Sequence, residues 1–224
     1  WEYMEQNPEH FAQFKLAKSI DIRPMSPNTL SCSAKRLFMF LNWCVKNGYL
    51  KSAGFRNVTL AQEVYGTPYY LTIQERDKVF YHDFSQNPRL DFHRDKFMFQ
   101  CLIGCRVSDL NSLTKANLVD GCIEYIPQKT KHEHASTVRV PLNQKAKDIL
   151  ARYTDLDDAL LPRFTQTMYN KMIKRILKHV GIDRMVRTLN PKTRQDEARP
   201  LWEVATSHTA RKTFIGNLYK QVKD

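Results

Sequence analysis

The sequence predicts a mainly α-helical protein with one small antiparallel β-sheet, divided into two domains. Apolar residues recur at helical spacing through most of the chain, which favours helices. Two short β-rich runs lie close together in residues 121–141 and give the only convincing strand signal. Between Phe55 and Tyr70 the periodicity fails and Gly66 and Pro68 appear, which indicates a linker. We therefore expect domains at residues 1–66 and 67–224.

The charge balance points to a polyanionic partner. The chain has 224 residues, of which 42% are apolar, enough for a globular protein with a real core. Its formal net charge is +12, and residues 163–224 hold 14 Lys and Arg against 5 Asp and Glu, so the excess lies near the C-terminal end. Such an excess is typical of proteins that bind nucleic acid. A basic but merely solvated face is the alternative.

The first domain is expected to be a small helical module. Residues 1–22 show apolar marks at helical spacing, and residues 29–47 form a broad apolar stripe that Asn47 and Gly48 close. Lys35 and Arg36 in the second helix could contact a DNA backbone, although a charge scatter of this kind is more often plain surface.

The second domain begins at Thr72, which forms a capping box with Glu75. An apolar core helix follows over residues 92–105 and ends near Gly104, just before Arg106. Residues 121–127 and 136–141 are predicted to pair as a β-hairpin. Its polar loop carries two lysines that could swing onto a bound anion or lie in solvent, namely Lys129 and Lys131.

Two further helices are expected over residues 143–153 and 167–180, followed by a polar loop over residues 183–200. The helix over 167–180 is apolar on one face and basic on the other. It could lie in or across a DNA groove, or simply be half buried and half solvated. Its candidate DNA contacts are Lys171, Lys174 and Arg175.

Other kinds of site have weak support. The five cysteines lack paired CxxC spacing, which favours reduced thiols in a cytosolic protein, with Cys101 and Cys105 buried as small apolar residues. His132 and His134 lack further ligands at metal spacing, so we expect no metal site there. No apolar run approaches the roughly 18 residues of a membrane span. Because the chain begins at Trp1, we interpret it as an excised fragment.

A phosphate-binding pattern lies near the end of the chain. Ser207 is a candidate helix N-cap, and His208 and Arg211 are three residues apart, which places both on one helix face beside the positive helix end. Arg106 opens a similar face, with Asp109 one turn later. Two arginines and a histidine that converge on one anion would form a phosphate site.

The order of these motifs resembles the tyrosine recombinase (integrase) family, and the run from Ser207 to Phe214 is similar to integrases of conjugative transposons. The motifs share their order and spacing with the family and are Gly104-x-Arg106-x-Ser108-Asp109-Leu110, Gln128-Lys129-Thr130, Val140-Pro141-Leu142 and His208-x-x-Arg211. The resemblance covers nearly the whole chain. It implies a helical core-binding (SAM-like) domain in residues 1–66 and a tyrosine recombinase catalytic fold in residues 67–224.

The resemblance implies a role for each main site residue. Arg106 and Arg211 match the two arginines that clamp the scissile phosphate, a task that suits planar guanidinium groups. Lys129 matches the hairpin lysine that protonates the departing 5′ oxygen, and Lys131 is the less favoured register for that role. His208 matches the histidine that hydrogen-bonds the phosphate and helps manage the proton of the nucleophile.

Two neighbouring residues have supporting roles in this scheme. Asp109 matches the acidic residue that orients the first arginine, and a purely structural ion pair with Arg106 is the alternative. Lys212, next to Arg211, is a candidate contact to the DNA backbone.

The chain departs from the family pattern at its end. The family places the nucleophilic tyrosine several tens of residues beyond the last arginine, whereas Tyr219 follows Arg211 by eight residues. We therefore expect the nucleophile in a missing C-terminal segment, and we expect this fragment to bind DNA without cleaving it.

The resemblance implies a recombinase that cuts and rejoins DNA through a 3′-phosphotyrosine, without metal or another cofactor, to integrate or excise a mobile element. Its implied partners are double-stranded DNA and, during recombination, other copies of itself in a homotetramer, with no membrane. Its implied location is the bacterial cytoplasm, with the nucleoid. A type IB topoisomerase and a non-catalytic DNA-binding protein on a recombinase scaffold are the two alternatives.

Overall fold

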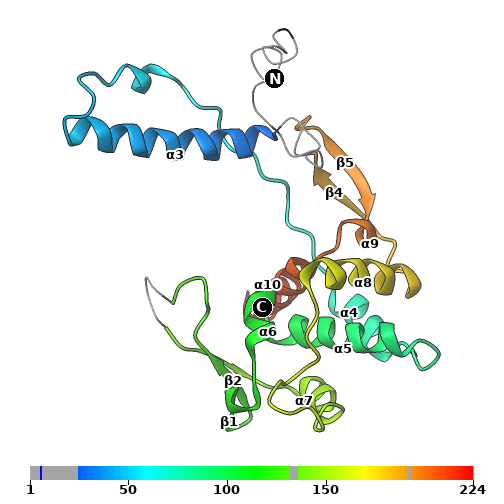
Figure 1. The fold of residues 1–224 in the computed structure, drawn as a ribbon. Helices are drawn as coiled ribbons and strands as arrows, with labels where there is room; N and C mark the ends of the chain where they lie inside the picture. The colour runs from blue at the N-terminus through cyan, green and yellow to red at the C-terminus, as the bar shows by residue number, and fades with distance from the viewer. Residues whose placement is uncertain (1–5, 7–24, 132–135, 191–192, 224) are drawn as a thin grey trace. The chain divides into compact units, whose positions relative to one another are not determined.

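The computed structural model describes residues 6, 25–131, 136–190 and 193–223, and it divides the chain into two compact units (Figure 1). Unit 1 comprises Trp1–Gly66 and Thr188–Glu197, and unit 2 comprises Thr67–Arg187 and Ala198–Asp224. Residues 188–197, which we expected in the second domain, therefore group with unit 1. Except for residue 6, the helix predicted over residues 1–22 lies outside the described residues. The loop with His132 and His134 also lies outside them.

Unit 1 contains one long helix, α3 (Pro27–Lys46), and a short 3-10 helix, η1 (Gly54–Asn57). The hydroxyl of Ser26 caps α3 by accepting a hydrogen bond from the backbone N–H of Thr29, and Pro27 suits the first turn because that turn needs no donor there. Asn47 ends the helix. The helix predicted over residues 29–47 is thus confirmed.

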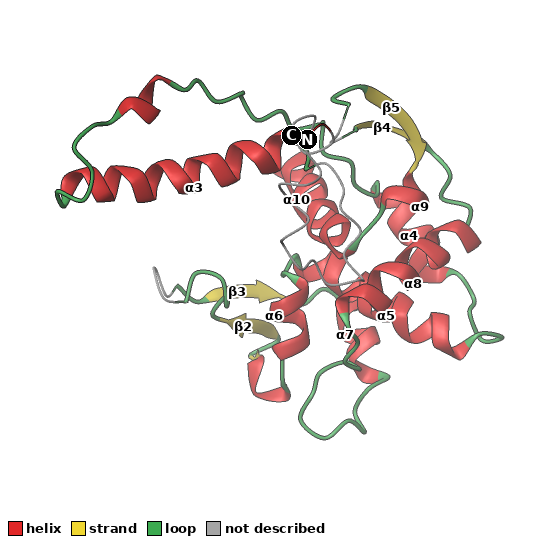
Figure 2. Ribbon diagram, turned by 45° about the horizontal axis from the view of Figure 1, so that its top comes forward, coloured by secondary structure: helices red, strands yellow, loops and turns green. Residues whose placement is uncertain are grey.

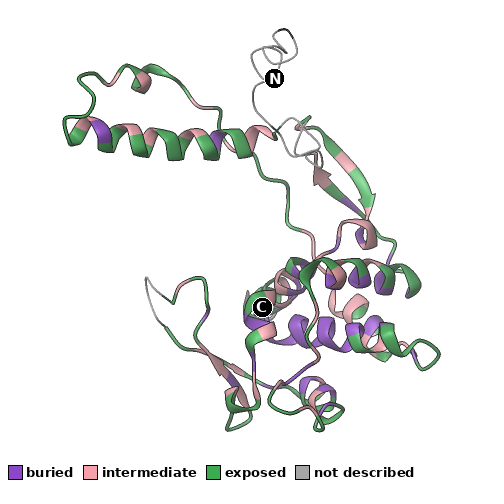
Figure 3. Cartoon of the chain, in the orientation of Figure 1, coloured by how far each residue is buried: buried purple, intermediate pink, exposed green. Residues whose placement is uncertain are grey.

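Unit 2 is built around helix α5 (Pro88–Ile103), most of whose residues are buried (Figure 3). Asn87 caps its first turn by accepting from the N–H of Leu90, and Gly104 ends it in the left-handed conformation, as predicted. Helices α4, α7, α8 and α10 pack against α5 and enclose its apolar side chains in one core.

The other helices of unit 2 surround this core (Figure 2). They are α4 (Ile73–Tyr81), α6 (Val107–Ser112), the 3-10 helix η2 (Lys115–Asn117), α7 (Gln144–Ala151), α8 (Gln166–His179), α9 (Leu201–Val204) and α10 (Ser207–Lys223). The predicted capping box is confirmed, because Thr72 and Glu75 each bond the backbone N–H of the other. The helices predicted over residues 143–153 and 167–180 are confirmed as α7 and α8. Within the described part of the chain, no helix is long and apolar enough to span a bilayer.

The predicted β-hairpin is present, and a third strand extends it. Strands β1 (Leu118–Val119), β2 (Cys122–Tyr125) and β3 (Val138–Pro141) form an antiparallel sheet in the order β1-β2-β3. Ile123 opposes Val140 in the register of β2 and β3 and is fully buried. With only two residues, β1 offers too little alternation for a sequence pattern to reveal.

The prediction of a polar loop over residues 183–200 is wrong. This segment contains strands β4 (Met185–Leu189) and β5 (Asp196–Pro200), which pair in a two-stranded sheet. Val186 is the only buried residue of β4, and the polar residues around it hide the two-residue alternation that marks a strand. The turn between the strands includes Arg194 in the left-handed region, with φ of 58°.

Candidate active site

The first part of the site is the turn that joins α5 to α6. Gly104 has φ of 70°, and a Cβ atom at this position would lie 2.3 Å from Cδ1 of Phe214. Only glycine fits, because both the backbone conformation and the ring of Phe214 exclude a side chain. Two residues later, Arg106 is the N-cap residue of α6, so its side chain projects from the start of that helix.

Side chains on both sides hold the backbone of this turn. Arg211 donates from Nη1 to the carbonyl oxygen of Gly104 at 2.6 Å, and Gln100 donates from Nε2 to the carbonyl oxygen of Cys105 at 3.0 Å. The hydroxyl of Tyr169, itself fully buried, donates to Oε1 of Gln100 at 3.0 Å. The two carbonyl groups that precede Arg106 are therefore fixed by the core and by α10.

The second part of the site is the start of α10. The sequence suggested Ser207 as the helix cap, but the structure gives that role to Thr206, whose hydroxyl accepts from the N–H of His208 at 3.3 Å. The backbone N–H of Thr206 in turn donates to the hydroxyl oxygen of Thr209 at 3.0 Å. Ser207 is buried, and its own N–H donates to Asn170. His208 and Arg211 are the second and fifth residues of the helix, near its N-terminal end, as expected.

Arg106 and Arg211 line one cavity of about 200 Å³. Both arginines are half-buried. Arg106 makes no hydrogen bond or ion pair from its side chain to any residue that the structure describes, and Arg211 has no ion-pair partner among the same residues. The other lining residues come from the α5–α6 turn, the β2–β3 hairpin and α10, and they are Ile103, Gly104, Tyr125, Pro127, Val138, Val140, Phe214 and Ile215.

His208 is exposed and does not line this cavity, although the same positive charges act on it. Partial burial lowers the pKa of His208 below its ordinary value, and the positive charges of Lys212, Arg211 and Arg106 lower it further. The charges of the two arginines therefore act on His208, which stands outside the cavity that they line. Positive charges that form no ion pair with a described carboxylate are suited to hold an anion such as a phosphate.

Asp109 takes a different place from the one expected. Its side chain is only 1% exposed, and Oδ1 accepts a hydrogen bond from the backbone N–H of Gln128 at 3.0 Å. No ion pair joins it to Arg106 within the described chain. Asp109 therefore contacts the loop after β2, whereas we expected it to contact Arg106.

The two hairpin lysines lie outside the cavity that contains the arginines. Lys129 is exposed in the turn that follows β2. Lys131 is also exposed and lines a different cavity of about 500 Å³, together with Gln128, Thr137 and residues of α6, η2, β1 and β2. Lys129 is thus on an element that borders the arginine cavity, since Tyr125 and Pro127 just before it line that cavity.

The other candidate DNA contacts fall into two groups. Arg36 on α3 and Lys171 and Arg175 on α8 are exposed, and Lys174 on α8 is half-buried. Lys35 and Lys212 have contacts within the protein: Lys35 forms an ion pair with Glu63, and the Nζ atom of Lys212 lies 4.7 Å from the ring centre of Tyr69.

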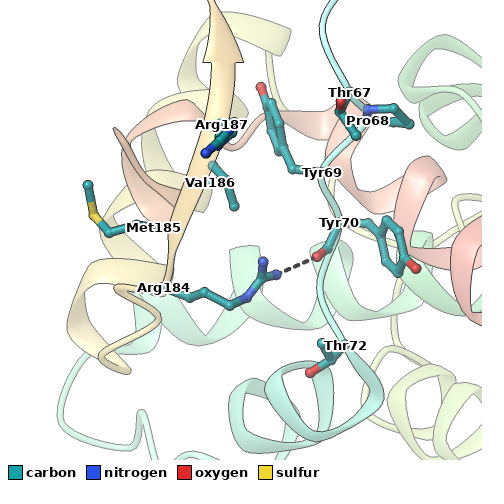
Figure 4. A pocket seen from close by; sticks show the side chains of 9 residues that line it. All are labelled: Thr67, Pro68, Tyr69, Tyr70, Thr72, Arg184, Met185, Val186 and Arg187. Atoms are coloured by element: carbon teal, nitrogen blue, oxygen red, sulfur yellow. Dashed lines mark hydrogen bonds between the residues drawn. The ribbon is translucent and has the colours of Figure 1, made fainter. Parts of the chain in front are cut away.

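A second cavity in unit 2, of about 390 Å³, lies between residues 67–72 and β4 (Figure 4). Its lining contains two arginines, but Arg184 donates to the carbonyl of Tyr70 at 2.9 Å and pairs with Glu75 at 2.7 Å. None of the residues predicted for the site lines this cavity. We therefore place the site at the cavity that contains Arg106 and Arg211.

The sequence pattern did not single out Tyr125, although it lines the arginine cavity. Burial, with the nearby Cys105 and Asp109, raises the pKa of Tyr125 to about 12, while the two arginines act in the opposite direction. The period of a strand could have found it, because Tyr125 lies on the same face of β2 as the buried Ile123. Cys101 and Cys105 are buried, as expected, and no group of three potential metal-binding side chains occurs among the described residues.

The chain has the tyrosine recombinase fold, as comparison with solved structures shows. The DNA-bound lambda integrase fragment (residues 75–356) matches with a TM-score of 0.62 and 16% identity, over 88% of this chain and 66% of that chain. The Tn1549 transposon integrase (residues 82–397), in complex with circular intermediate DNA, matches with a TM-score of 0.63 and 16% identity, over 100% of this chain and 72% of that one.

A lambda integrase tetramer bound to a Holliday junction also matches, with a TM-score of 0.59 and 16% identity, over 84% of this chain and 53% of that one. The chain thus spans between about half and three quarters of the length of these structures. No family model matches it, and no curated protein matches it. At these identities the likeness establishes the fold alone.

Proposed function

We propose that the protein is a site-specific DNA recombinase that cuts and rejoins DNA strands through a 3′-phosphotyrosine. The observation that carries this proposal is the cavity that Arg106 and Arg211 line together, where neither forms an ion pair with a carboxylate among the described residues. The charges of both arginines also act on the exposed His208. A DNA backbone phosphate has the charge and the oxygen acceptors that such a cluster binds best.

Each residue has a task in the strand cleavage. A tyrosine oxygen attacks the phosphorus and forms the phosphotyrosyl bond, and the bond from phosphorus to the 5′ oxygen breaks. Arg106 and Arg211 stabilise the charge on the non-bridging oxygens, and His208 donates a hydrogen bond to one of them. Lys129 gives a proton to the departing 5′ oxygen. The free 5′ hydroxyl of another strand then reverses these steps and rejoins the DNA.

Tyr219, the one tyrosine after Arg211 in this sequence, is poorly placed for the attacking role in this scheme. Tyr219 lies on α10, and its side chain is 63% exposed. Tyr219 follows Arg211 by eight residues, which is a little more than two helical turns. Because one rigid helix carries both side chains, Tyr219 has little freedom to reach a phosphate held by Arg211.

The proposed partner is double-stranded DNA, with a homotetramer as the assembly that exchanges strands. The matched structures are described as DNA complexes, and one of them is a tetramer on a Holliday junction, which supports this proposal by likeness of fold. The exposed cations Arg36, Lys171 and Arg175 are proposed contacts to the DNA backbone. The mobile element is proposed from likeness to the transposon integrase. A bacterial cytoplasmic location, with the nucleoid, is proposed from the family resemblance of the sequence.

The test uses the natural full-length protein and a nicked duplex that carries the ends of its own genetic element. The nick lets the cleaved end diffuse away, so a covalent protein–DNA adduct accumulates and is resolved on a denaturing gel. We expect an adduct that disappears with Arg211→Ala. The matched control is Arg89→Ala, since Arg89 is exposed at the far end of α5 from the site.

Other results would favour the alternatives. DNA binding in a gel shift without any adduct would support a non-catalytic binding protein. An adduct accompanied by relaxation of supercoiled DNA, without recombinant products, would support a topoisomerase. An adduct mapped to Tyr219 would overturn the expected position of the nucleophile.

A further inference from the structure

The buried carboxylate of Asp109 is joined to the hairpin that carries Lys129. Asp109 is the third residue of α6, three positions after Arg106, and its side chain is only 1% exposed. Oδ1 accepts from the backbone N–H of Gln128 at 3.0 Å. Oδ2 is buried as well and has no hydrogen-bond partner among the described residues. Burial of a carboxylate costs free energy unless hydrogen bonds compensate it. The hydrogen bond to the N–H of Gln128 therefore indicates the role of Asp109.

Gln128 is the second residue of a tight turn that follows β2. The N–H of Thr130 donates to the carbonyl oxygen of Pro127 at 3.2 Å, which closes a four-residue turn with Gln128 and Lys129 at its centre. Pro127 is buried against the arginine cavity. A turn of this kind moves as a unit, so a contact that holds the N–H of Gln128 also fixes the backbone of Lys129.

The two ends of this link lie on the two elements that the cleavage scheme needs together. Asp109 shares the short helix α6 with Arg106, whose guanidinium lines the cavity. The turn carries Lys129, which is exposed and has no side-chain hydrogen bond or ion pair within the described chain. The side chain of Lys129 is long and flexible, so only its backbone can be placed in advance of binding.

We propose that Asp109 is a positioning residue for Lys129. Its carboxylate holds the turn over residues 127–130 to α6, so that the ammonium group of Lys129 reaches the 5′ oxygen of a phosphate held by Arg106. The resemblance to the family implies a different role, in which this acidic residue orients the arginine. The inference rests on the proposed function, because it needs Lys129 to be the proton donor.

The chemistry of the leaving group separates these two roles. When the bond from phosphorus to the 5′ oxygen breaks, the oxygen keeps the electron pair and takes a proton from Lys129. If sulfur replaces that bridging oxygen, a thiolate leaves without help, because thiols have a pKa of about 8.5 and alcohols a far higher one. A substrate with 5′-bridging sulfur therefore makes Lys129, and any residue that positions it, dispensable. It does not replace Arg106, which binds the non-bridging oxygens.

The experiment measures single-turnover adduct formation on the oxygen and the sulfur substrate, with the natural full-length protein. Asp109→Ala should lower the rate on the oxygen substrate by roughly 10- to 100-fold, a part of the 10²- to 10⁴-fold that general acid catalysis contributes. On the sulfur substrate its rate should return to within about threefold of the unmodified protein, as should that of Lys129→Ala. Arg106→Ala should remain slow on both substrates.

Two more variants keep the test independent of folding. Gln128→Pro removes the N–H that Asp109 accepts, and proline suits this turn position, so it should reproduce the defect of Asp109→Ala with an intact carboxylate. Asp109→Asn keeps an oxygen acceptor and should be less impaired than Asp109→Ala. Asp148→Ala, an exposed aspartate on α7, is the control and should leave both rates unchanged.

The outcomes distinguish the inference from the function beneath it. If sulfur restores Lys129→Ala but neither Asp109→Ala nor Gln128→Pro, the positioning role is overturned and Asp109 acts elsewhere. Unimpaired cleavage by both of these variants on the oxygen substrate would overturn it too. If sulfur fails to restore the rate of Lys129→Ala, the proposed role of Lys129 as proton donor is wrong. If the unmodified protein forms no adduct, the proposed function as a whole is wrong.

Discussion

Arg211 donates a 2.6 Å hydrogen bond from Nη1 to the carbonyl oxygen of Gly104, so one of the two candidate phosphate ligands also holds the turn that leads to the other. A guanidinium group has five donors and can hold this carbonyl while other N–H groups face the cavity. Arg106, by contrast, has no such contact within the described chain. The two arginines share a cavity but differ in what they do for the fold.

This difference predicts unequal effects of two conservative substitutions. Arg211→Lys should lower the free energy of unfolding by about 1 to 3 kcal/mol, because a hydrogen bond from a charged donor is lost and the Gly104 carbonyl is left without it. Arg106→Lys should change stability by less than about 0.5 kcal/mol. Urea unfolding followed by tryptophan fluorescence measures both. Equal stability of the two variants would contradict the structural role of Arg211.

The turn at Gly104 should tolerate no side chain. Gly104→Ala should cost about 2 to 4 kcal/mol, because the left-handed backbone disfavours alanine and the new methyl group would overlap the ring of Phe214. Gly121→Ala is the matched control, since Gly121 has a similar φ of 72° but nothing within 4 Å of the added carbon. It should lose only the backbone part, about 1 to 2 kcal/mol. Similar losses for both variants would rule out the clash with Phe214.

The buried Lys96 should make stability rise with pH in the alkaline range. It is 1% exposed, with Nζ bonded to Oδ1 of Asn111 at 2.6 Å and to the carbonyl of Pro162 at 2.9 Å, and burial lowers its pKa from 10.5 to about 8. Between these two values the unfolded lysine binds a proton that the folded lysine has released. The free energy of unfolding contributed by this group therefore increases as pH rises from about 8 to 10.5.

The comparison with Lys96→Met isolates this effect from the tyrosines and cysteines that titrate in the same range. The difference in unfolding free energy between the unmodified protein and the variant should shift in favour of the unmodified protein by up to about 3 kcal/mol across that interval. Lys147→Met, at an exposed lysine of α7, should show no such shift. A constant difference across the range for Lys96→Met would show that the lysine is not held at a lowered pKa.

DNA binding should be coupled to a proton at His208. Its pKa is lowered by partial burial and by the cations Lys212, Arg211 and Arg106, and a bound phosphate would offset those charges and raise it. The complex then binds more protons than the free protein, so DNA affinity should rise as pH falls toward the histidine range. Binding titrations between about pH 5 and pH 8 should show a smaller pH dependence for His208→Gln than for the control, His179→Gln. Equal slopes would place His208 away from the phosphate.

Patterns of sequence predicted the helices and the main hairpin because local signals were strong there. Asn47 and Gly48 end α3, Gly104 ends α5, and the box of Thr72 and Glu75 starts α4, as each signal indicated. The strands β4 and β5 escaped because a single buried residue, Val186, leaves no alternation in β4 to detect. The period of the pattern, and not the composition, decides whether such a strand is visible.

The sequence could predict the candidate phosphate-binding residues, but not the hydrogen bonds that hold the backbone around them. Residue types and spacing predicted one cluster of Arg106, His208 and Arg211. The structure places the two arginines at one cavity and leaves His208 exposed outside its lining. The contact of Asp109 with Gln128 depends on how α6 and the hairpin pack, which no local pattern specifies. The bond from Gln100 to Cys105 likewise joins a helix interior to the turn beyond it, where a buried polar residue in the sequence gives no sign of its partner.

The central claim, that Arg106 binds a DNA backbone phosphate in the cavity it shares with Arg211, has a direct thermodynamic test. Equilibrium binding is measured for a duplex with a normal phosphate at the mapped cleavage position and for one with an uncharged methylphosphonate there, each with the unmodified protein and with Arg106→Ala. The unmodified protein should lose about tenfold or more in affinity when that phosphate is neutralised, whereas Arg106→Ala should lose almost nothing further. An equal loss for both proteins would show that Arg106 does not contact this phosphate.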